Sequence, residues 1–199
     1  MYFVRHGQAI HNVAKDNHKG EGNPYLDPAL TDAPLTQLGR EQARRLLPST
    51  SALLVEVVIC SPLSRAVETA CLGFAAQLER GVPFVAVESC REQLGQNLCD
   101  ARCETALAAA AHTRVDFSAI APTDELFTPT RETLSELTCR AAAFLRLLQQ
   151  RPERRIAVVT HSSFLAALFN AAADCSAAPE LGAWFDTAEI RGVQLRFHK

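Results

Sequence analysis

Reactive side chains follow two short apolar runs in this sequence. Arg5 and His6 come directly after residues 2–4, and His161 follows residues 156–160. A neutral imidazole can attack phosphorus, and an adjacent guanidinium can hold phosphate oxygens. An isolated Arg-His-Gly tripeptide is usually no more than a polar turn. The case for chemistry therefore depends on what the other apolar runs deliver.

Two further apolar runs also end in polar clusters. Residues 53–60 form a β-branched run with a single charge, and Arg65 follows shortly after its end. The run at 83–87 precedes a cluster that includes Glu88 and Glu92. Apolar runs of this kind are typical of strands buried in a parallel sheet. All four runs are therefore expected to be strands that end in polar residues.

Strands that alternate with helices predict an α/β fold with a mostly parallel sheet covered on both faces. Such sheets bind ligands at the carboxyl ends of their strands. We therefore expect the four strand ends to bring two arginines, two histidines and an acid to one site. That set can form a phosphate cradle with a nucleophile and a proton donor, and it does not require a metal.

Arg65 is expected in the first turn of a helix. Ser61 fits an N-cap and Pro62 the first helical position, with the helix running to about Glu79. A cation there opposes the helix dipole, which favours anions at that end. Arg65 is therefore expected to have an anionic partner, and the helix N-terminus to contribute to the phosphate cradle.

The intervening segments predict loops and helices around this site. Residues 11–34 are rich in Asn, Asp, Gly and Pro and lack a hydrophobic period. This composition predicts a long loop beside the site, and the loop carries Asn12. An irregular lid is expected at residues 93–130, after the third strand. Helices are expected at 35–47 with Thr36 as N-cap, at 104–111, at 131–150 and at 162–173, and two short tail strands at 187–197, broken near Gly192.

Length and charge narrow the class of protein. The chain has 199 residues, 48% of them hydrophobic, which fits a single domain over residues 1–199 with 93–130 as an excursion. The formal net charge is −2 with both signs interspersed, so no uniform positive field is expected to hold nucleic acid or an anionic membrane. Any anion site is expected to be local.

Cysteine usage and the start of the chain predict its compartment. The seven cysteines are an odd number and show no Cys-x-x-Cys pair, so they are expected to be reduced. The first strand begins next to Met1, which leaves no room for a presequence, and no apolar stretch is long enough to span a bilayer. A cytoplasmic protein is expected.

Four motifs together resemble the histidine phosphatase superfamily, over nearly the whole chain. They are Val4–Arg5–His6–Gly7 with Asn12, Leu35–Thr36–Gln37–Leu38–Gly39 with Gln42–Ala43, Ser61–Pro62–Leu63–Ser64–Arg65 with Glu68–Thr69, and Val158–Val159–Thr160–His161. The segment at 91–102 is similar to a branch of fungal and plant phosphoglycerate-mutase-like phosphatases. The resemblance implies a three-layer α/β/α sandwich with a mixed sheet, the tail strands supplying its non-parallel part.

The resemblance also implies roles for individual residues. His6 corresponds to the nucleophile that becomes phosphohistidine, and Arg5, Arg65 and His161 to the groups that hold the phosphoryl oxygens. Glu92 corresponds to the acid. Asn12 is carried over as a phosphate-binding residue, and so is Ser162, which stands where many relatives have glycine and could add a hydroxyl contact.

Several functional alternatives remain open at this point. The leading expectation is a phosphomonoesterase that uses no cofactor and no metal and acts on a small phosphomonoester. The alternatives are a phosphoglycerate mutase-type isomerase and a non-catalytic phosphate-binding module. Glu88 competes with Glu92 as proton donor, with Asp124 or Glu125 as further candidates. The sequence names neither the substrate nor the oligomeric state.

Overall fold

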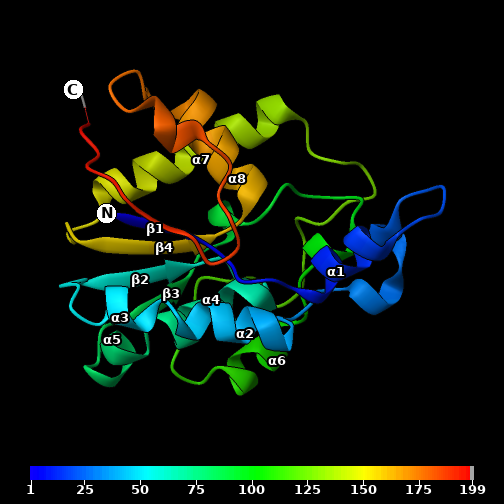
Figure 1. Cartoon of the computed structure of the whole chain (residues 1–199), viewed down its shortest axis with the longest axis horizontal. Helices are drawn as coiled ribbons and strands as arrows, with labels where there is room; N and C mark the ends of the chain where they lie inside the picture. Colours follow the sequence, from blue (N-terminus) through cyan, green and yellow to red (C-terminus); the bar gives the residue numbers. More distant parts are fainter. Residues whose placement is uncertain (198–199) are drawn as a thin grey trace.

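The computed structural model describes residues 1–197, and a single mixed sheet lies at the centre of that part of the chain (Figure 1). Its order is β3-β2-β4-β1-β5. The first four strands in the chain pair in parallel, and β5 is antiparallel to β1. The strands are β1 (Tyr2–Arg5), β2 (Val57–Cys60), β3 (Phe84–Ala86), β4 (Ile156–Thr160) and β5 (Ile190–Gly192). The predicted mixed α/β sheet is therefore confirmed.

Alternating side chains explain why the central strands are apolar throughout. Val57 and Ile59 of β2 pack into the core on one face of the sheet, whereas Val58 and Cys60 pack into the core on the other. Because helices cover both faces, every residue of β2 is buried. A sheet buried on both sides selects a continuous apolar run rather than a polar alternation.

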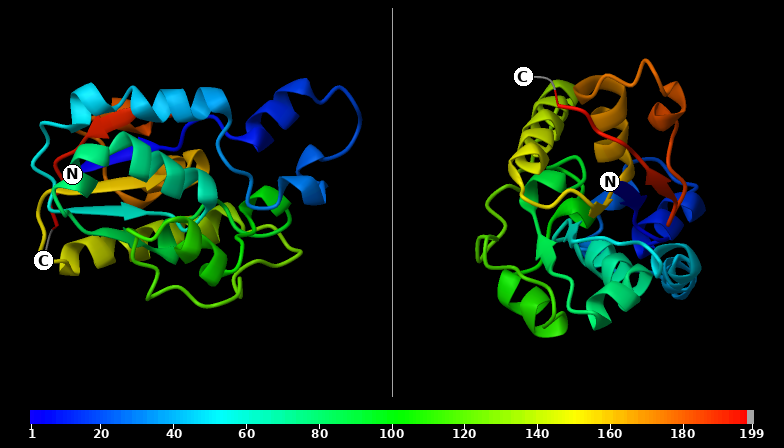
Figure 2. Two further views of the ribbon diagram at one scale, coloured as in Figure 1. Left: turned by 90° about the horizontal axis from the view of Figure 1, so that it is seen from below. Right: turned by 90° about the vertical axis from the view of Figure 1, so that its left-hand side faces the viewer.

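Helices form a layer on each face of the sheet (Figures 1 and 2). One layer holds α7 (Leu134–Gln150) and α8 (Ser162–Ala167), which continues as a π-helical turn at Leu168–Ala172. The other holds α2 (Gln37–Arg44) and α4 (Ser64–Gly73), with α3 (Leu47–Thr50), α5 (Ala75–Glu79) and α6 (Thr105–Ala111) on the same side. The expected three-layer sandwich is present.

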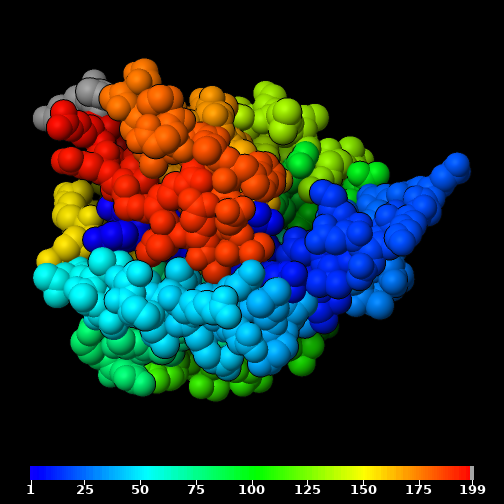
Figure 3. Space-filling view, in the orientation of Figure 1, coloured from blue at the N-terminus to red at the C-terminus, as the bar shows by residue number. Residues whose placement is uncertain are grey.

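The first long loop was predicted incorrectly in part. Residues Ile10–Asn17 form helix α1, and only short 3-10 turns at Pro24–Leu26 and Pro28–Leu30 follow it. Ala9 provides no side-chain cap for α1, and most residues of α1 are polar or small, so the local pattern did not indicate a helix there. In the space-filling view, α1 and the segment after it project from the body of the molecule (Figure 3).

The tail also differs from expectation. Within the described residues it contributes one strand, β5, and the rest of residues 187–197 has no regular strand. All seven cysteines are free thiols in the structure; Cys60, Cys90 and Cys99 are buried, whereas Cys139 is exposed. Over residues 1–197 we find no helix that combines the length and the apolar character needed to cross a membrane.

Candidate active site

Strand register places the predicted residues next to one another. Arg5 of β1 lies opposite Thr160 of β4. The backbone N–H of His6 donates to the Thr160 carbonyl at 2.9 Å, one residue before His161. The two histidines therefore leave neighbouring strands at the same level, and their ring centroids are 5.1 Å apart. Ser61 leaves β2 alongside them, because its N–H donates to the Val159 carbonyl at 3.0 Å.

His6 is a buried neutral imidazole with a defined tautomer. Its Nδ1 lies 2.6 Å from the Gly7 carbonyl oxygen. A carbonyl can only accept, so Nδ1 carries the proton and Nε2 keeps its lone pair. Nε2 accepts from Arg65 Nε at 3.3 Å. Burial lowers the pKa of His6 well below 6.5, and the charges of Arg65 and His11 add to the effect. A neutral ring with an unprotonated nitrogen is the form that can act as a nucleophile.

Two glycines shape the turn that carries His6. A Cβ on Gly7 would lie 2.5 Å from the Gly39 carbonyl oxygen, and a Cβ on Gly39 would lie 1.9 Å from the Gln8 carbonyl oxygen. The turn after β1 and the start of α2 therefore touch backbone to backbone. Thr36 caps α2 as predicted, by accepting from Gly39 N–H at 3.0 Å, and its hydroxyl donates to the Gln8 side chain at 2.7 Å.

Arg65 has the anionic partner that its position required. Its side chain is 0% exposed, and its Nη2 donates to Asp100 Oδ1 at 2.8 Å. Its Nη1 donates to the Cys99 carbonyl at 2.5 Å. With Nε directed at His6, the guanidinium has a partner on each of its three nitrogens.

The helix N-terminus beside Arg65 is not the open anion site that was predicted. α4 begins at Ser64 rather than at Pro62. The Asp32 carboxylate occupies that end, accepting from Ser64 N–H and from Ser64 Oγ, both at 2.8 Å. Ser61 is not the N-cap, because Leu63 occupies that position. The Ser61 Oγ accepts from Leu63 N–H at 3.4 Å and lies 2.8 Å from His161 Nε2. Asp32 is 32 residues away in sequence, so local pattern could not reveal this cap.

His161 is fully buried behind His6. Burial lowers the pKa of His161 well below 6.5, with further contributions from the charges of Arg65 and His6. Its Nδ1 has no hydrogen-bond partner among residues 1–197. A buried ring nitrogen without a partner, next to His6, retains an unused hydrogen-bonding capacity in this part of the molecule.

A cavity of about 430 Å³ opens above this cluster. Four of the predicted residues line it: Arg5, Asn12, Glu92 and Ser162. Arg5 donates from Nη1 to the Phe185 carbonyl at 2.7 Å, while its buried Nε has no partner within the described chain. The Glu92 carboxylate lies at the N-terminal end of α8, where it accepts from the N–H groups of Ser163 at 3.3 Å and Phe164 at 3.2 Å. His6, Arg65 and His161 are buried and are not among the residues that line the cavity.

The competing carboxylates are placed elsewhere. Glu88 pairs with Arg102 at 2.7 Å and with Arg91 at 3.1 Å. Asp124 pairs with Arg91 at 2.7 Å. Neither of them lines the cavity, and Glu125 is also absent from its lining. Glu92 is thus the one carboxylate proposed as a proton donor that faces the cavity.

Sequence reasoning missed several residues that line the cavity, among them His11, Asp100 and Arg131. His11 has its ring centroid 5.7 Å from that of His6, and burial with the charges of Arg65 and Arg5 lowers its pKa to about 2. Asp100 lines the cavity from the segment that was expected to be an irregular lid. Arg131 lines it from the position where a helix was expected to begin, whereas α7 begins at Leu134. His11 would have been found by recognising the helix at Ile10–Asn17, whereas no local signal places Asp100 against Arg65.

Comparison with known proteins shows which family the chain belongs to. The family model of the histidine phosphatase superfamily, branch 1, matches residues 1–196. A phosphoglycerate mutase-like protein of Arabidopsis thaliana is 33% identical, with 97% of this chain and 83% of the relative covered. A second, phosphoglycerate mutase-like protein 1 of the same plant, is 36% identical, with 86% of this chain and 71% of the relative covered.

Solved structures show the same fold. The α-ribazole phosphatase of Shigella flexneri superposes with a TM-score of 0.62 at 21% identity, covering 95% of this chain and 87% of that one. The mycobacterial glucosyl-3-phosphoglycerate phosphatase has a TM-score of 0.56 at 21% identity, covering 96% and 90%. The chain belongs to branch 1 of the histidine phosphatase superfamily. Within that branch, its similarity to the Arabidopsis phosphoglycerate mutase-like proteins extends over most of its length.

Proposed function

We propose that this chain is a phosphomonoesterase that acts through a phosphohistidine at His6. The observation that supports this most directly is the state of the ring: its proton is fixed on Nδ1 by the Gly7 carbonyl, and its Nε2 lone pair lies at the Arg65 guanidinium. A phosphoryl group between Nε2 and Arg65 would meet a nucleophile and a cation together.

The first chemical step transfers the phosphoryl group to the enzyme. Nε2 of His6 forms a bond to phosphorus, and the ester P–O bond breaks with its electron pair going to the leaving oxygen. That oxygen takes a proton from Glu92, which faces the cavity. The Gly7 carbonyl remains bonded to Nδ1–H and stabilises the positive charge that the ring acquires.

The second step is hydrolysis. Water attacks phosphorus, its proton goes to the Glu92 carboxylate, and the P–N bond breaks to return the lone pair to Nε2. Arg5, Arg65 and His161 hold the phosphoryl oxygens in both steps, because charge-assisted donors stabilise the charge that gathers on them. Asn12 and Ser162 line the same cavity and contact the bound ester.

Similarity to phosphoglycerate mutase-like proteins keeps isomerase activity as the second candidate. A mutase would retain the phosphohistidine and return the group to the product, so the two activities differ in whether free phosphate appears. The proposed reaction needs no metal, since the residues named above supply the nucleophile, the acid and the cations.

The test is a phosphate-release screen of purified protein over sugar phosphates, nucleotides, phosphoglycerates and para-nitrophenyl phosphate. We expect turnover with at least one ester, unchanged by a chelator. We expect His6→Ala to abolish it and His18→Ala, at an exposed histidine, to leave it intact. Interconversion of 2- and 3-phosphoglycerate without phosphate release would favour the mutase. Loss of turnover on metal removal, restored by adding the metal back, would refute the metal-free mechanism.

A further inference from the structure

The lid segment, residues 93–130, holds the end of Arg65. Its Cys99 carbonyl accepts from Arg65 Nη1 at 2.5 Å, and its Asp100 carboxylate accepts from Arg65 Nη2 at 2.8 Å. These contacts occupy the two terminal nitrogens of the guanidinium. The remaining nitrogen, Nε, is the one that faces His6. The direction of the N–H at the nucleophile is therefore set by two consecutive residues of the lid segment.

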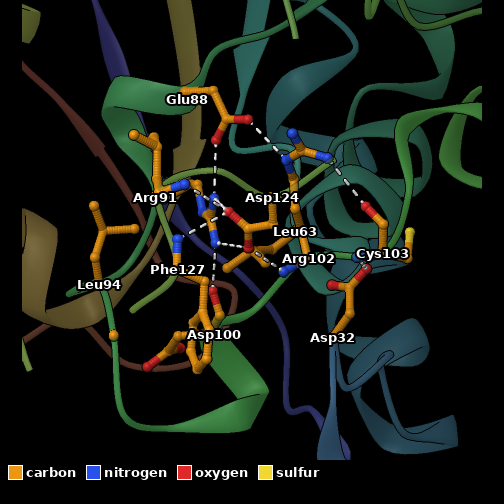
Figure 4. Close-up of polar contacts among 12 residues, drawn as sticks. Asp32, Leu63, Glu88, Arg91, Leu94, Asp100, Arg102, Cys103, Asp124 and Phe127 are labelled. Carbon is orange, nitrogen blue, oxygen red and sulfur yellow. Dashed lines mark hydrogen bonds and ion pairs between the residues drawn. The ribbon is translucent and has the colours of Figure 1, made fainter. Parts of the chain in front are cut away.

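Asp100 is itself held rigidly. Its second carboxylate oxygen accepts from Arg131 Nη1 at 2.8 Å, and its side chain is almost completely buried. Its backbone carbonyl accepts from Arg91 Nη2 at 2.6 Å. Figure 4 shows the Arg91 guanidinium between Glu88 and Asp100, with the Asp124 carboxylate beside it. Arg91 is fully buried, so this anchor is well shielded from solvent.

The geometry matters because the Cys99 carbonyl and the Asp100 carboxylate together set the direction of Arg65 Nε–H. A long side chain such as arginine loses several rotatable degrees of freedom when it is held in one position. A misplacement of about 1 Å at a reacting centre can lower a rate by about a hundredfold. A carboxylate with one oxygen on each of two arginines resists such movement.

We propose that Asp100 is a positioning residue for phosphoryl transfer, which orients the Arg65 guanidinium so that Nε–H faces Nε2 of His6. The inference rests on the proposed phosphatase function. Asp100 does not itself need to touch the substrate. It acts through Arg65, and Arg131 and Arg91 hold it in place.

The charge of Asp100 gives this role a distinctive signature. A carboxylate near the phosphate site repels an incoming phosphate dianion, since like charges at short range oppose binding. Removing the carboxylate relieves that repulsion while it loosens Arg65. Turnover is therefore expected to fall without weaker binding of the dianion, whereas general loosening of the lid segment would weaken both.

The experiment compares Asp100→Asn, which keeps one acceptor oxygen, with Asp100→Leu, which has a similar shape and no acceptor. We expect kcat for para-nitrophenyl phosphate to fall about tenfold in the first and about a hundredfold in the second. We expect KM and the Kd of inorganic phosphate to stay equal or decrease in both. The control is Glu132→Gln, which breaks the buried ion pair with Arg140 near the lid segment but touches neither Arg65 nor Asp100.

Five outcomes decide the matter. The expected split between kcat and Kd, with Glu132→Gln close to wild type in kcat, supports the inference. Wild-type kcat in Asp100→Leu overturns it and leaves the phosphatase function standing. Equal kcat losses in Asp100→Leu and Glu132→Gln, or a weaker Kd of inorganic phosphate in Asp100→Leu, also overturn it. Absence of wild-type turnover on every ester overturns the phosphatase function and the inference with it.

Discussion

At the scale of single residues, the site is set by protonation states that the surroundings impose. His6, His11 and His161 all have pKa values lowered from 6.5, and burial is the largest cause for each. An imidazolium has no lone pair with which to attack phosphorus, so a ring kept neutral near pH 7 is ready to react. Burial alone does not decide which ring nitrogen of His6 carries the proton. The Gly7 carbonyl fixes that proton on Nδ1.

The proton donor can be tested by leaving-group dependence. An alkoxide leaving group needs a proton as the P–O bond breaks, whereas nitrophenolate hardly does. We expect Glu92→Gln to slow hydrolysis of alkyl phosphates at least about a hundredfold more than that of para-nitrophenyl phosphate. Steady-state kinetics with both esters measure this contrast.

Glu88→Gln is the matched control for that experiment. Glu88 pairs with Arg91 and Arg102 and lies away from the cavity, so its variant should show no preference between the two leaving groups. A leaving-group contrast in Glu88→Gln together with none in Glu92→Gln would reverse the assignment.

At the scale of elements, the contact between α2 and the turn after β1 positions the nucleophile. We expect Gly39→Ala to disturb this turn, because its Cβ would lie 1.9 Å from the Gln8 carbonyl oxygen and one backbone must move. Overpacking of this kind costs about 1–3 kcal/mol of unfolding free energy. Urea denaturation and phosphate-release kinetics should both show a loss.

Gly20→Ala provides the comparison for Gly39→Ala. A Cβ at Gly20 would approach only the side chain of His18, at 3.4 Å. We expect wild-type stability and turnover from this variant. Unchanged stability and turnover in Gly39→Ala would show that the close contact does not hold the turn.

The elements that carry the site were predictable because their signals are local. The apolar run ending at Arg5 and the one ending at Thr160 identify strands, and parallel strands present their carboxyl ends at one edge. The partners of Arg65 and of the α4 N-terminus were not predictable. Asp100 and Asp32 reach them from 35 and 32 residues away, through backbone paths with no repeating pattern.

At the scale of the whole molecule, the buried histidines couple stability to pH. Above about pH 6.5 both the folded and the unfolded chain keep these rings neutral, so their full contribution is present. Below that pH the unfolded chain binds protons that the folded chain does not, and stability falls as the pH falls. For His11 the loss continues toward its folded pKa of about 2.

We therefore expect the free energy of unfolding to decrease below pH 6.5 by roughly 1.4 kcal/mol per pH unit for each histidine involved. Urea denaturation at pH 7.5, 6.5 and 5.5 measures the slope. In His11→Leu the free energy of unfolding should fall less steeply with decreasing pH, because unfolding takes up about one proton fewer. A free energy that stays constant or rises between pH 6.5 and 5.5 would contradict this expectation.

The central claim is a covalent phosphoryl group on His6, and direct trapping tests it. Protein is mixed with a ³²P-labelled ester that it hydrolyses, quenched in alkali and digested with trypsin. The peptide at residues 6–15 contains both His6 and His11, and fragmentation separates them. We predict label on His6 alone, and none in His6→Ala. Label on His11, His161 or a cysteine, or turnover with no labelled protein at any quench time, would contradict the account.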